Sequence, residues 1–585
     1  MTTVNPITLE VVRNALIAYA DEMATVLCRT AYNMMIFEVR DYCVGIVDPE
    51  GRIIAQNTGG LPIFLADLGA AVKGAIDIHG VESFKEGDVY ISNDPAVCGQ
   101  HLNNVVVFTP FFHEGKLVAF PALRAHWVDV GGGSRGFGST SSHEIYNEGL
   151  QLCGVRAYSG GEANNEVLRM IRDNIRYPDS SFGDLRAQIA GCRLGERRLS
   201  ELYTKYGAET VDDCITTIWD QSEKLARHAV AQIPDGTYEA SSFIDNDLIS
   251  RDKTIPIKVK VVVDGEEMTI DFSELPPQQK GPVNSGASGG IAAARVAFKC
   301  ITAPLGVVNE GEMRPLKIIL PEGTMLSALP PAPLGIWSIS LPTVIDTILK
   351  ALADVLPNSI TAAHKGDMGG LAMFGFDEAH KRRFICLNIF GGGFGARPNG
   401  DGLDAVVSVT QGNVRNAPVE VQEAYYPLQI ETHRLRPDSG GAGKYRGGLG
   451  VEIVMKSDQD FFMNTHFQRT KLPPWGLKGG LDGAPMSAEI VRADGTTEPG
   501  NILDSMRIAS GDRMIVRSAG GGGHGNPLDR DAHAVAQDVR NGVVSREAAQ
   551  EAYGVVFFND LDELDIEATK SERASRNAKH MELAK

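Results

Sequence analysis

Several motifs that would identify a catalytic class by themselves are missing from this sequence. It has no GxxxxGK[ST] phosphate loop, no GxGxxG that opens a helix after a strand, and no HExxH. The usual nucleotide-binding and zinc-protease signatures are therefore excluded. No apolar run approaches the roughly 18 residues of a membrane span, and the opening MTTVNPITLEVV has no basic stretch before an apolar one. We expect neither a membrane segment nor a secretory signal.

Positive charge and paired cysteines are also scarce. The 56 basic residues are outnumbered by 74 acidic ones, which gives a net charge of −18. This balance argues against nucleic acid and anionic membranes as partners. The eight cysteines are scattered without a CxxC pair, so they form neither a disulfide framework nor a zinc ribbon. A reduced, cytoplasmic protein is the simplest interpretation.

Two histidines stand at the ends of one predicted hairpin. Its strands, 105–110 and 117–123, are separated by His113-Glu114-Gly115, and a hairpin brings the residues outside its two strands together. His101 and His126 occupy those places, and Asp129 follows three residues later before a glycine run. Two imidazoles and a carboxylate suit a divalent transition metal. Ordinary histidines at strand ends would give the same pattern, so spacing alone leaves both possibilities open.

Other polar residues near this hairpin have two possible roles each. Asp41 opens a second predicted hairpin, 42–47 with 53–56, and is either a further ligand or the partner of Arg40. Glu148 follows a Gly/Ser-rich loop, and it is either an acid or base or a solvated helix carboxylate. The loop itself, 131–142, is a substrate-binding device or a plain connection.

The apolar pattern predicts an α+β, multi-domain fold. Helical periods with hairpins dominate the first part of the chain, and a period of two with glycine-rich loops dominates the rest. We expect an N-terminal helical and hairpin-rich metal-binding part followed by β-rich domains. The expected divisions are a metal-binding catalytic domain at 1–235, a mixed α/β domain at 236–400, a β-rich domain with terminal helices at 401–565, and a flexible tail at 566–585.

Motifs spread over nearly the whole chain resemble one family. They are NPITLEVVRNAL from Asn5, EVRDYCVGIVDPEG from Glu38, GDVYISNDP from Gly87, GQHLNNV from Gly99, RAHWVDVGG from Arg124, EIYNEGL from Glu144, DLRAQIAGCRLGERR from Asp184, IDFSELPPQQKGPVN from Ile270, RPDSGGAGKYRGGLG from Arg436 and SAGGGGHGNPLDRDAHAVAQDVRNGVVSREAAQEAYGVV from Ser518. Their order resembles the hydantoinase B/5-oxoprolinase family. Its members are metal-bearing subunits of ATP-dependent hydantoinases, N-methylhydantoinases and caprolactamases, and they are related to acetone and acetophenone carboxylase subunits.

The resemblance implies a metal held by Asp41, His101, His126 and Asp129, with zinc, manganese or iron as the ion. It also implies an actin-like hydantoinase A-type partner that binds ATP and magnesium, in an α2β2 hetero-oligomer. The partner would phosphorylate the carbonyl of a small cyclic amide such as hydantoin, N-methylhydantoin, 5-oxoproline or caprolactam. This chain would then hydrolyse the activated ring, with Glu148 as the candidate for proton handling.

The sequence departs from the family pattern beside the expected site. The family usually has GGTHLPD where this chain has Cys98 to Asn104, and Trp127 replaces a second histidine. We expect Asn103, Asn104 and Trp127 near the pocket, where they would affect substrate choice. Two alternatives remain: a subunit of an ATP-dependent ketone carboxylase, or a non-catalytic scaffold for the ATPase partner.

Overall fold

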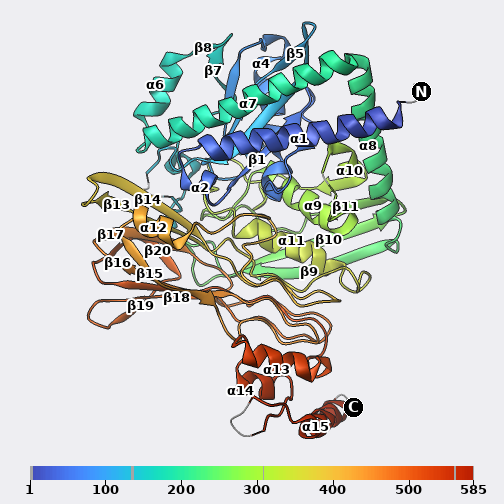
Figure 1. Cartoon of the computed structure of the whole chain (residues 1–585), viewed down its shortest axis with the longest axis vertical. Coiled ribbons are helices and arrows are strands. Elements are labelled where there is room, and N and C mark those ends of the chain that lie inside the picture. Colours follow the sequence, from blue (N-terminus) through green and yellow to red (C-terminus); the bar gives the residue numbers. More distant parts are fainter. Residues whose placement is uncertain (1–3, 134–136, 307, 559–561, 584–585) are drawn as a thin grey trace.

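The N-terminal hairpins join into one antiparallel sheet at the top of the molecule (Figure 1). The computed structural model describes residues 4–133, 137–306, 308–558 and 562–583. The strand order is β2-β1-β6-β4-β3-β7-β8, and β5 pairs with β6. Both predicted hairpins are confirmed. The strands are β1 (Tyr42–Val47), β2 (Ile53–Gln56), β3 (Val89–Ser92), β4 (Asn104–Phe108), β5 (Phe111–His113), β6 (Lys116–His126), β7 (Val155–Ser159) and β8 (Glu162–Ala163).

Long helices cover one face of this sheet. α1 and α7 pack on each other, and α7 also lies on β4 and β6. The side chain of Asn5 caps α1 by accepting hydrogen bonds from the N–H groups of Ile7 and Thr8, as expected for an Asn before Pro. The helices of this part are α1 (Pro6–Thr30), α2 (Met34–Phe37), α3 (Pro62–Leu65), α4 (Leu68–His79), η1 (Val81–Ser83), α5 (Pro95–Cys98), η2 (Ile145–Asn147), α6 (Asn165–Asp173), α7 (Pro178–Tyr206) and α8 (Ala208–Val230).

A second sheet, with order β12-β11-β10-β9, packs against α11 and shares its core with the first sheet. Exposed residues alternate with partly or fully buried ones along β9, and buried residues alternate with more exposed ones along β10, so one face meets this core and the other meets water. The elements are β9 (Gly236–Ile244), β10 (Ile255–Asp264), β11 (Glu267–Asp271), α9 (Ala287–Thr302), α10 (Glu310–Met313), β12 (Leu316–Ile319) and α11 (Ser340–Ala351).

Two further antiparallel sheets form the lower part, with orders β14-β13-β17-β20 and β15-β16-β21-β18-β19. They share one hydrophobic core, into which Met34, Met35 and Val128 of the N-terminal part also pack. The elements are β13 (Gly370–Asp377), β14 (Arg382–Ile389), α12 (Val419–Tyr425), β15 (Leu428–Leu435), β16 (Val451–Ser457), β17 (Phe461–His466), β18 (Ser487–Val491), β19 (Thr497–Pro499), β20 (Ile502–Ile508) and β21 (Arg513–Arg517).

Glycine-rich segments cross each other between these sheets and the C-terminal helices. A Cβ on Gly393 would lie 1.9 Å from the carbonyl oxygen of Gly448 and 2.0 Å from the nitrogen of Gly521. The backbones are hydrogen bonded there, with Gly448 N–H donating to Phe394 O at 2.8 Å. The glycine clusters therefore allow close backbone approach.

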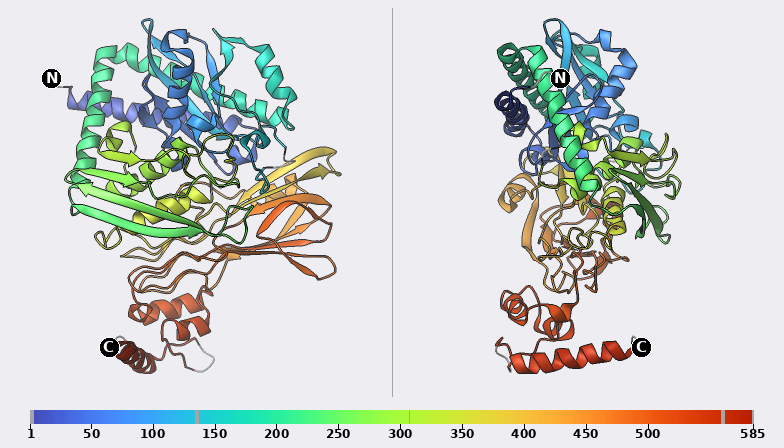
Figure 2. Two further views of the ribbon diagram at one scale, coloured as in Figure 1. Left: turned by 180° about the vertical axis from the view of Figure 1, so that it is seen from behind. Right: turned by 90° about the vertical axis from the view of Figure 1, so that its right-hand side faces the viewer.

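The C-terminal helices stand apart below the sheets (Figure 2). Residues 566–583, for which a flexible tail is predicted, form a helix instead. Arg573 explains the difference, because its guanidinium donates to the carbonyls of Tyr553 and Arg530 at 2.9 and 2.7 Å. The elements are η3 (Pro527–Asp529), α13 (Ala532–Arg540), α14 (Arg546–Glu551) and α15 (Ile566–Leu583).

The architecture is α+β, as predicted from the sequence. The division at 235, 400 and 565 remains a prediction. Among the described helices none is long and apolar enough to cross a membrane.

Candidate functional site

Asp41 and His126 lie opposite each other at the ends of two paired strands. The register of β1 and β6 pairs Tyr42 with Ala125, and the next N–H, that of His126, donates to the carbonyl of Asp41 at 3.2 Å. Opposed residues of antiparallel strands project to the same face. Arg40, just before Asp41, has a φ of 64°, a conformation that costs free energy and is found preferentially at functional sites. The fold thus joins Asp41 to the histidine hairpin.

His101 and His126 face each other across the hairpin. Their ring centroids are 5.0 Å apart, with the rings at 79°. Burial lowers the pKa of His126 to about 4. Burial, and then the neighbouring His126, hold the pKa of His101 well below 6.5. Both imidazoles are therefore neutral at pH 7, the form in which a ring nitrogen can bind a metal.

Three buried atoms of the predicted ligands lack a hydrogen-bond partner among the described residues: Asp41 Oδ1, His101 Nε2 and His126 Nδ1. Burial without a countercharge raises the pKa of Asp41 to about 7. Buried polar atoms are normally paired, so a cluster of unpaired donors and acceptors points to a missing ligand. The nitrogen and oxygen atoms suit a divalent transition metal. As the described side chains stand, no group of three His, Cys, Asp or Glu is close enough to enclose an ion.

Asp129, the fourth predicted ligand, accepts three backbone hydrogen bonds. Its Oδ1 accepts from the N–H of Gly131 at 3.0 Å. Its Oδ2 accepts from the N–H groups of Arg176 and Tyr177. The carboxylate therefore joins the end of the hairpin to the segment that precedes α7. These three hydrogen bonds leave one acceptor site of the carboxylate, on Oδ1, for a further ligand.

Glu148 fixes the loop at Leu334 and Gly335, which contacts His101. Its two carboxylate oxygens accept from the N–H groups of Leu334 and Gly335 at 3.0 and 2.8 Å, and burial raises its pKa to about 7. Its place is the C-cap of η2, not the face of an α-helix. The same loop places the carbonyl oxygen of Gly335 3.3 Å from His101 Nδ1.

The tautomer of His101 depends on two competing neighbours. Trp337 Nε1 lies 3.0 Å from His101 Nδ1 and can only donate, whereas the Gly335 carbonyl can only accept. When Nδ1 carries the proton and donates to Gly335, the lone pair of Nε2 is free. This is the tautomer that a metal on Nε2 requires.

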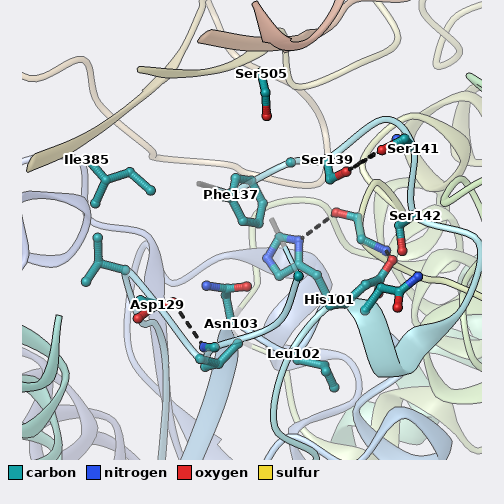
Figure 3. A pocket seen from close by; sticks show the side chains of 18 of the residues that line it. His101, Leu102, Asn103, Asp129, Phe137, Ser139, Ser141, Ser142, Ile385 and Ser505 are labelled. Carbon is teal, nitrogen blue, oxygen red and sulfur yellow. Dashed lines mark hydrogen bonds between the residues drawn. The ribbon is translucent and has the colours of Figure 1, made fainter. Parts of the chain in front are cut away.

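A cavity of about 320 Å³ opens beside these residues (Figure 3). Pockets of this size hold small ligands. Its walls come from the histidine hairpin, the loop after it, the loop that contains Gly335, β14 and β20. The lining residues are His101, Leu102, Asn103, Val128, Asp129, Val130, Gly131, Gly133, Phe137, Gly138, Ser139, Ser141, Ser142, Asn147, Glu148, Tyr177, Gly335, Ile385, Asp504 and Ser505.

The three residues that depart from the family pattern lie in different places. Asn103 lines the cavity and donates to the carbonyl of Trp127 at 2.9 Å. Asn104 is buried and donates to Gln100 at 2.8 Å. Trp127 was expected near the pocket, but it is fully buried and its Nε1 donates to Gln188 at 2.8 Å. Successive residues of an extended strand point to opposite faces, so Trp127 enters the core beneath α7 while His126 faces the site.

Sequence reasoning missed Phe137. Its ring meets the rings of His101 and His126 edge to face, with centroid distances of 4.9 and 5.0 Å. The Phe137 carbonyl accepts from Asn464 Nδ2 at 3.0 Å, and Asn464 Oδ1 accepts from the N–H of Ser505 at 2.6 Å. Asn464 therefore joins the two walls of the cavity. The one signal in the sequence is a lone aromatic residue inside a Gly/Ser-rich loop.

Comparison with known proteins identifies relatives over nearly the full length. The family model described as hydantoinase B/oxoprolinase matches residues 5–527. The B subunit of the putative D-/L-hydantoinase of Pseudomonas sp. (strain NS671) is 33% identical over 589 residues, which covers 97% of this chain and 98% of that protein. The beta subunit of the caprolactamase of Pseudomonas jessenii is 30% identical over 587 residues, covering 98% of this chain and 100% of that protein.

Solved structures show the same fold. The crystal structure of ATP-dependent caprolactamase from Pseudomonas jessenii superposes with a TM-score of 0.91 at 30% identity, over 98% of this chain and 100% of that one. The nucleotide-free structure of acetone carboxylase superposes with a TM-score of 0.90 over 99% of this chain and 83% of that one. Its identity is 19%, so this second likeness concerns the fold alone.

Proposed function

Because this chain belongs to the hydantoinase B/oxoprolinase family, we propose that it is the ring-opening subunit of an ATP-dependent hydrolase that acts on a cyclic amide. The observation that carries the proposal is the cavity beside His101, whose predicted metal-binding neighbours have unpaired polar atoms in the described structure. A scaffold would have no need of such a site, because unpaired buried polar groups are costly.

ATP would be used on a partner subunit. The chain has no phosphate-loop motif, and two of its relatives are named as the B or the beta component of a multi-subunit enzyme. We propose a hydantoinase A-type partner that binds ATP and magnesium, in an α2β2 assembly. Transfer of the terminal phosphoryl group of ATP to the amide oxygen, with release of ADP, would make the carbonyl carbon electrophilic enough for attack by water. The ring C–N bond would then break as the nitrogen takes up a proton, and hydrolysis would release inorganic phosphate and leave a carboxylate.

Asp41, His101, His126 and Asp129 would hold the metal. When bound there, a zinc, manganese or iron ion would supply a Lewis acid that lowers the pKa of a water towards neutrality. Gly335 would fix the tautomer of His101 by accepting its Nδ1 proton. Asp129 would also keep the end of the hairpin in place through its three backbone N–H contacts.

Glu148 would handle protons at the cavity wall. A carboxyl group with a pKa of about 7 can accept or release a proton at neutral pH. The backbone N–H groups of Leu334 and Gly335 hold its oxygens in place. Phe137 and the buried surroundings of the imidazoles would keep bulk water away from the reacting carbonyl.

The alternative function is that of a ketone carboxylase subunit, since this chain shares its fold with acetone carboxylase. It predicts that the complex would consume acetone and bicarbonate with ATP and would leave cyclic amides unchanged. Offering both substrate classes to the same preparation decides between the two functions.

The experiment reconstitutes the chain with its hydantoinase A-type partner and measures phosphate release and ring-opened product in parallel. Asp41→Ala and the isosteric Asp41→Asn should retain substrate-dependent ATP turnover while ring-opened product falls by orders of magnitude. Asp77→Ala, at a surface carboxylate with 62% exposure paired with Lys73, is the matched control. A loss of less than about tenfold, roughly 1.4 kcal/mol of barrier, is too small for the proposed role of Asp41. Absence of ATP-dependent hydrolysis with every cyclic amide would refute the function.

A further inference from the structure

A closed ring of four hydrogen bonds joins two of the predicted metal ligands. The N–H of His126 donates to the carbonyl of Asp41 at 3.2 Å, and the N–H of Asp41 donates to the carbonyl of Met35 at 2.8 Å. The N–H of Met35 donates to Asn33 Oδ1 at 3.0 Å, and Asn33 Nδ2 donates to the carbonyl of His126 at 2.9 Å. The amide of one side chain therefore closes the ring that holds the backbones of both ligands.

The amide of Asn33 fits this ring in one orientation. Its oxygen faces the N–H of Met35 and its NH2 group faces the carbonyl of His126, because a backbone N–H only donates and a carbonyl only accepts. Asn33 is 7% exposed, so bulk water does not compete for either contact. A buried polar side chain that is paired at both ends makes its surroundings more rigid.

Helix α7 holds the ring from outside. Asp184 Oδ1 accepts from the N–H groups of Tyr32 and Asn33 at 2.7 and 3.1 Å. Three residues earlier, Ser181 Oγ donates to the carbonyl of Asp129, the fourth predicted ligand, at 3.1 Å. Both side chains of α7 are fully buried, and residues three apart share one face of a helix. One face of α7 thus places Asp129 relative to the ring.

We propose that Asn33 is a positioning residue for the metal site, because its amide fixes the backbones of Asp41 and His126 relative to each other. The inference rests on the metal site of the proposed ring-opening subunit. With both backbones held, only side-chain rotation remains to be ordered when an ion binds, which limits the entropy lost on binding. Ligands of a metal site must be held to within about 0.5 Å, so a small backbone shift at either residue should weaken the site.

Asn33 also caps the short helix α2, so the test has to separate the cap from the contact with His126. Asn33→Ser keeps a good N-cap residue, but its shorter side chain gives up the contact with the His126 carbonyl. Asn33→Asp keeps the volume and the cap and replaces the donor by an oxygen. Asn57→Ser is the matched control, because Asn57 is 4% exposed and its Oδ1 accepts from the N–H of Val44 in β1 at 2.8 Å.

The full-length chain is stripped of metal and titrated with Zn²⁺, Mn²⁺ and Co²⁺ against a competing chelator. Both Asn33 variants should bind each ion at least about tenfold more weakly than wild type, the lower end of the loss found when the support of a metal ligand is removed. The visible absorption of bound Co²⁺ should change as well, since it depends on coordination geometry. Asn57→Ser should keep the wild-type dissociation constants and spectrum, with a fall in thermal midpoint similar to that of Asn33→Ser.

The possible results separate the positioning role from the proposed function. Wild-type affinity and spectrum in the Asn33 variants would overturn the inference, and so would an equal loss of affinity in Asn57→Ser. If one Asn33 variant does not fold, the other decides. Failure of wild type to bind any of the three ions would overturn the metal site and the inference with it. Weakened binding in the Asn33 variants, in a chain whose reconstituted complex opens no cyclic amide, would support the positioning role and overturn the proposed function.

Discussion

Gln188 is expected to determine the stability of the strands that carry the site. It lies on α7 and is fully buried. Its Oε1 accepts from Trp127 Nε1 at 2.8 Å, and its Nε2 donates to the carbonyls of Val105 and Leu123 at 2.9 and 3.0 Å. One side chain thus connects the helix to β4, to β6 and to the residue after His126.

Gln188→Leu would keep the volume and remove all three hydrogen bonds. At roughly 0.5–1.5 kcal/mol for each net hydrogen bond, the three contribute about 1.5–4.5 kcal/mol. Because about 1.4 kcal/mol corresponds to a tenfold change in an equilibrium constant, local opening should become roughly 10- to 1,600-fold more frequent. A chain with several sheets need not unfold in one step, so a local measurement is required.

Native-state hydrogen exchange followed by mass spectrometry gives that measurement. Amides of β4 and β6 should exchange faster by the stated factor in Gln188→Leu, while those of β16 in the C-terminal sheet keep their rates. Gln221→Leu is the control, because Gln221 is exposed on α8 and accepts one bond from Arg13. Acceleration below about tenfold in β4 and β6, or equal acceleration in β16, would refute the reasoning that these bonds act locally.

Two further predictions concern the metal and the pH dependence. Purified chain should contain about one transition-metal ion, and His126→Ala should lose most of it while remaining folded; equal metal content by elemental analysis would contradict the assignment. Burial raises the pKa of Asp184 to about 7, above its ordinary value of 3.8, so the folded state binds the proton more tightly and this residue lowers stability as pH rises from about 4 to about 7. Both of its hydrogen bonds, from the N–H groups of Tyr32 and Asn33, go to Oδ1, and Oδ2 has no partner among the described residues. Asp184→Asn should therefore raise the thermal midpoint relative to wild type at pH 8 and change it little at pH 4; the same shift at both values would rule out titration as the cause.

The apolar periodicity and the turn residues of the sequence predict much of the local structure. The cap at Asn5, both N-terminal hairpins and the long helices α1, α7 and α8 are predictable because each depends on neighbours in sequence, whereas the short helices α2, α3 and α5 are not. The meeting of His101 with His126 belongs to this class, since a hairpin enforces it. The helix at 566–583 was missed because its contacts with Arg530 and Tyr553 lie outside the segment and its own apolar content is low.

Residues far apart in the chain complete the site, and only the tertiary structure could bring them together. Asp41 reaches His126 because β1 pairs with β6, and the hydrogen bonds of Asp129 depend on the chain before α7. Phe137 and Ser505 meet through Asn464, more than 300 residues beyond Phe137. Such contacts arise from the packing of one sheet against another and leave no local period in the sequence. The sequence by itself thus determined the strands, the turns and the histidine pair, whereas the packing of the sheets decided the cavity and its charges.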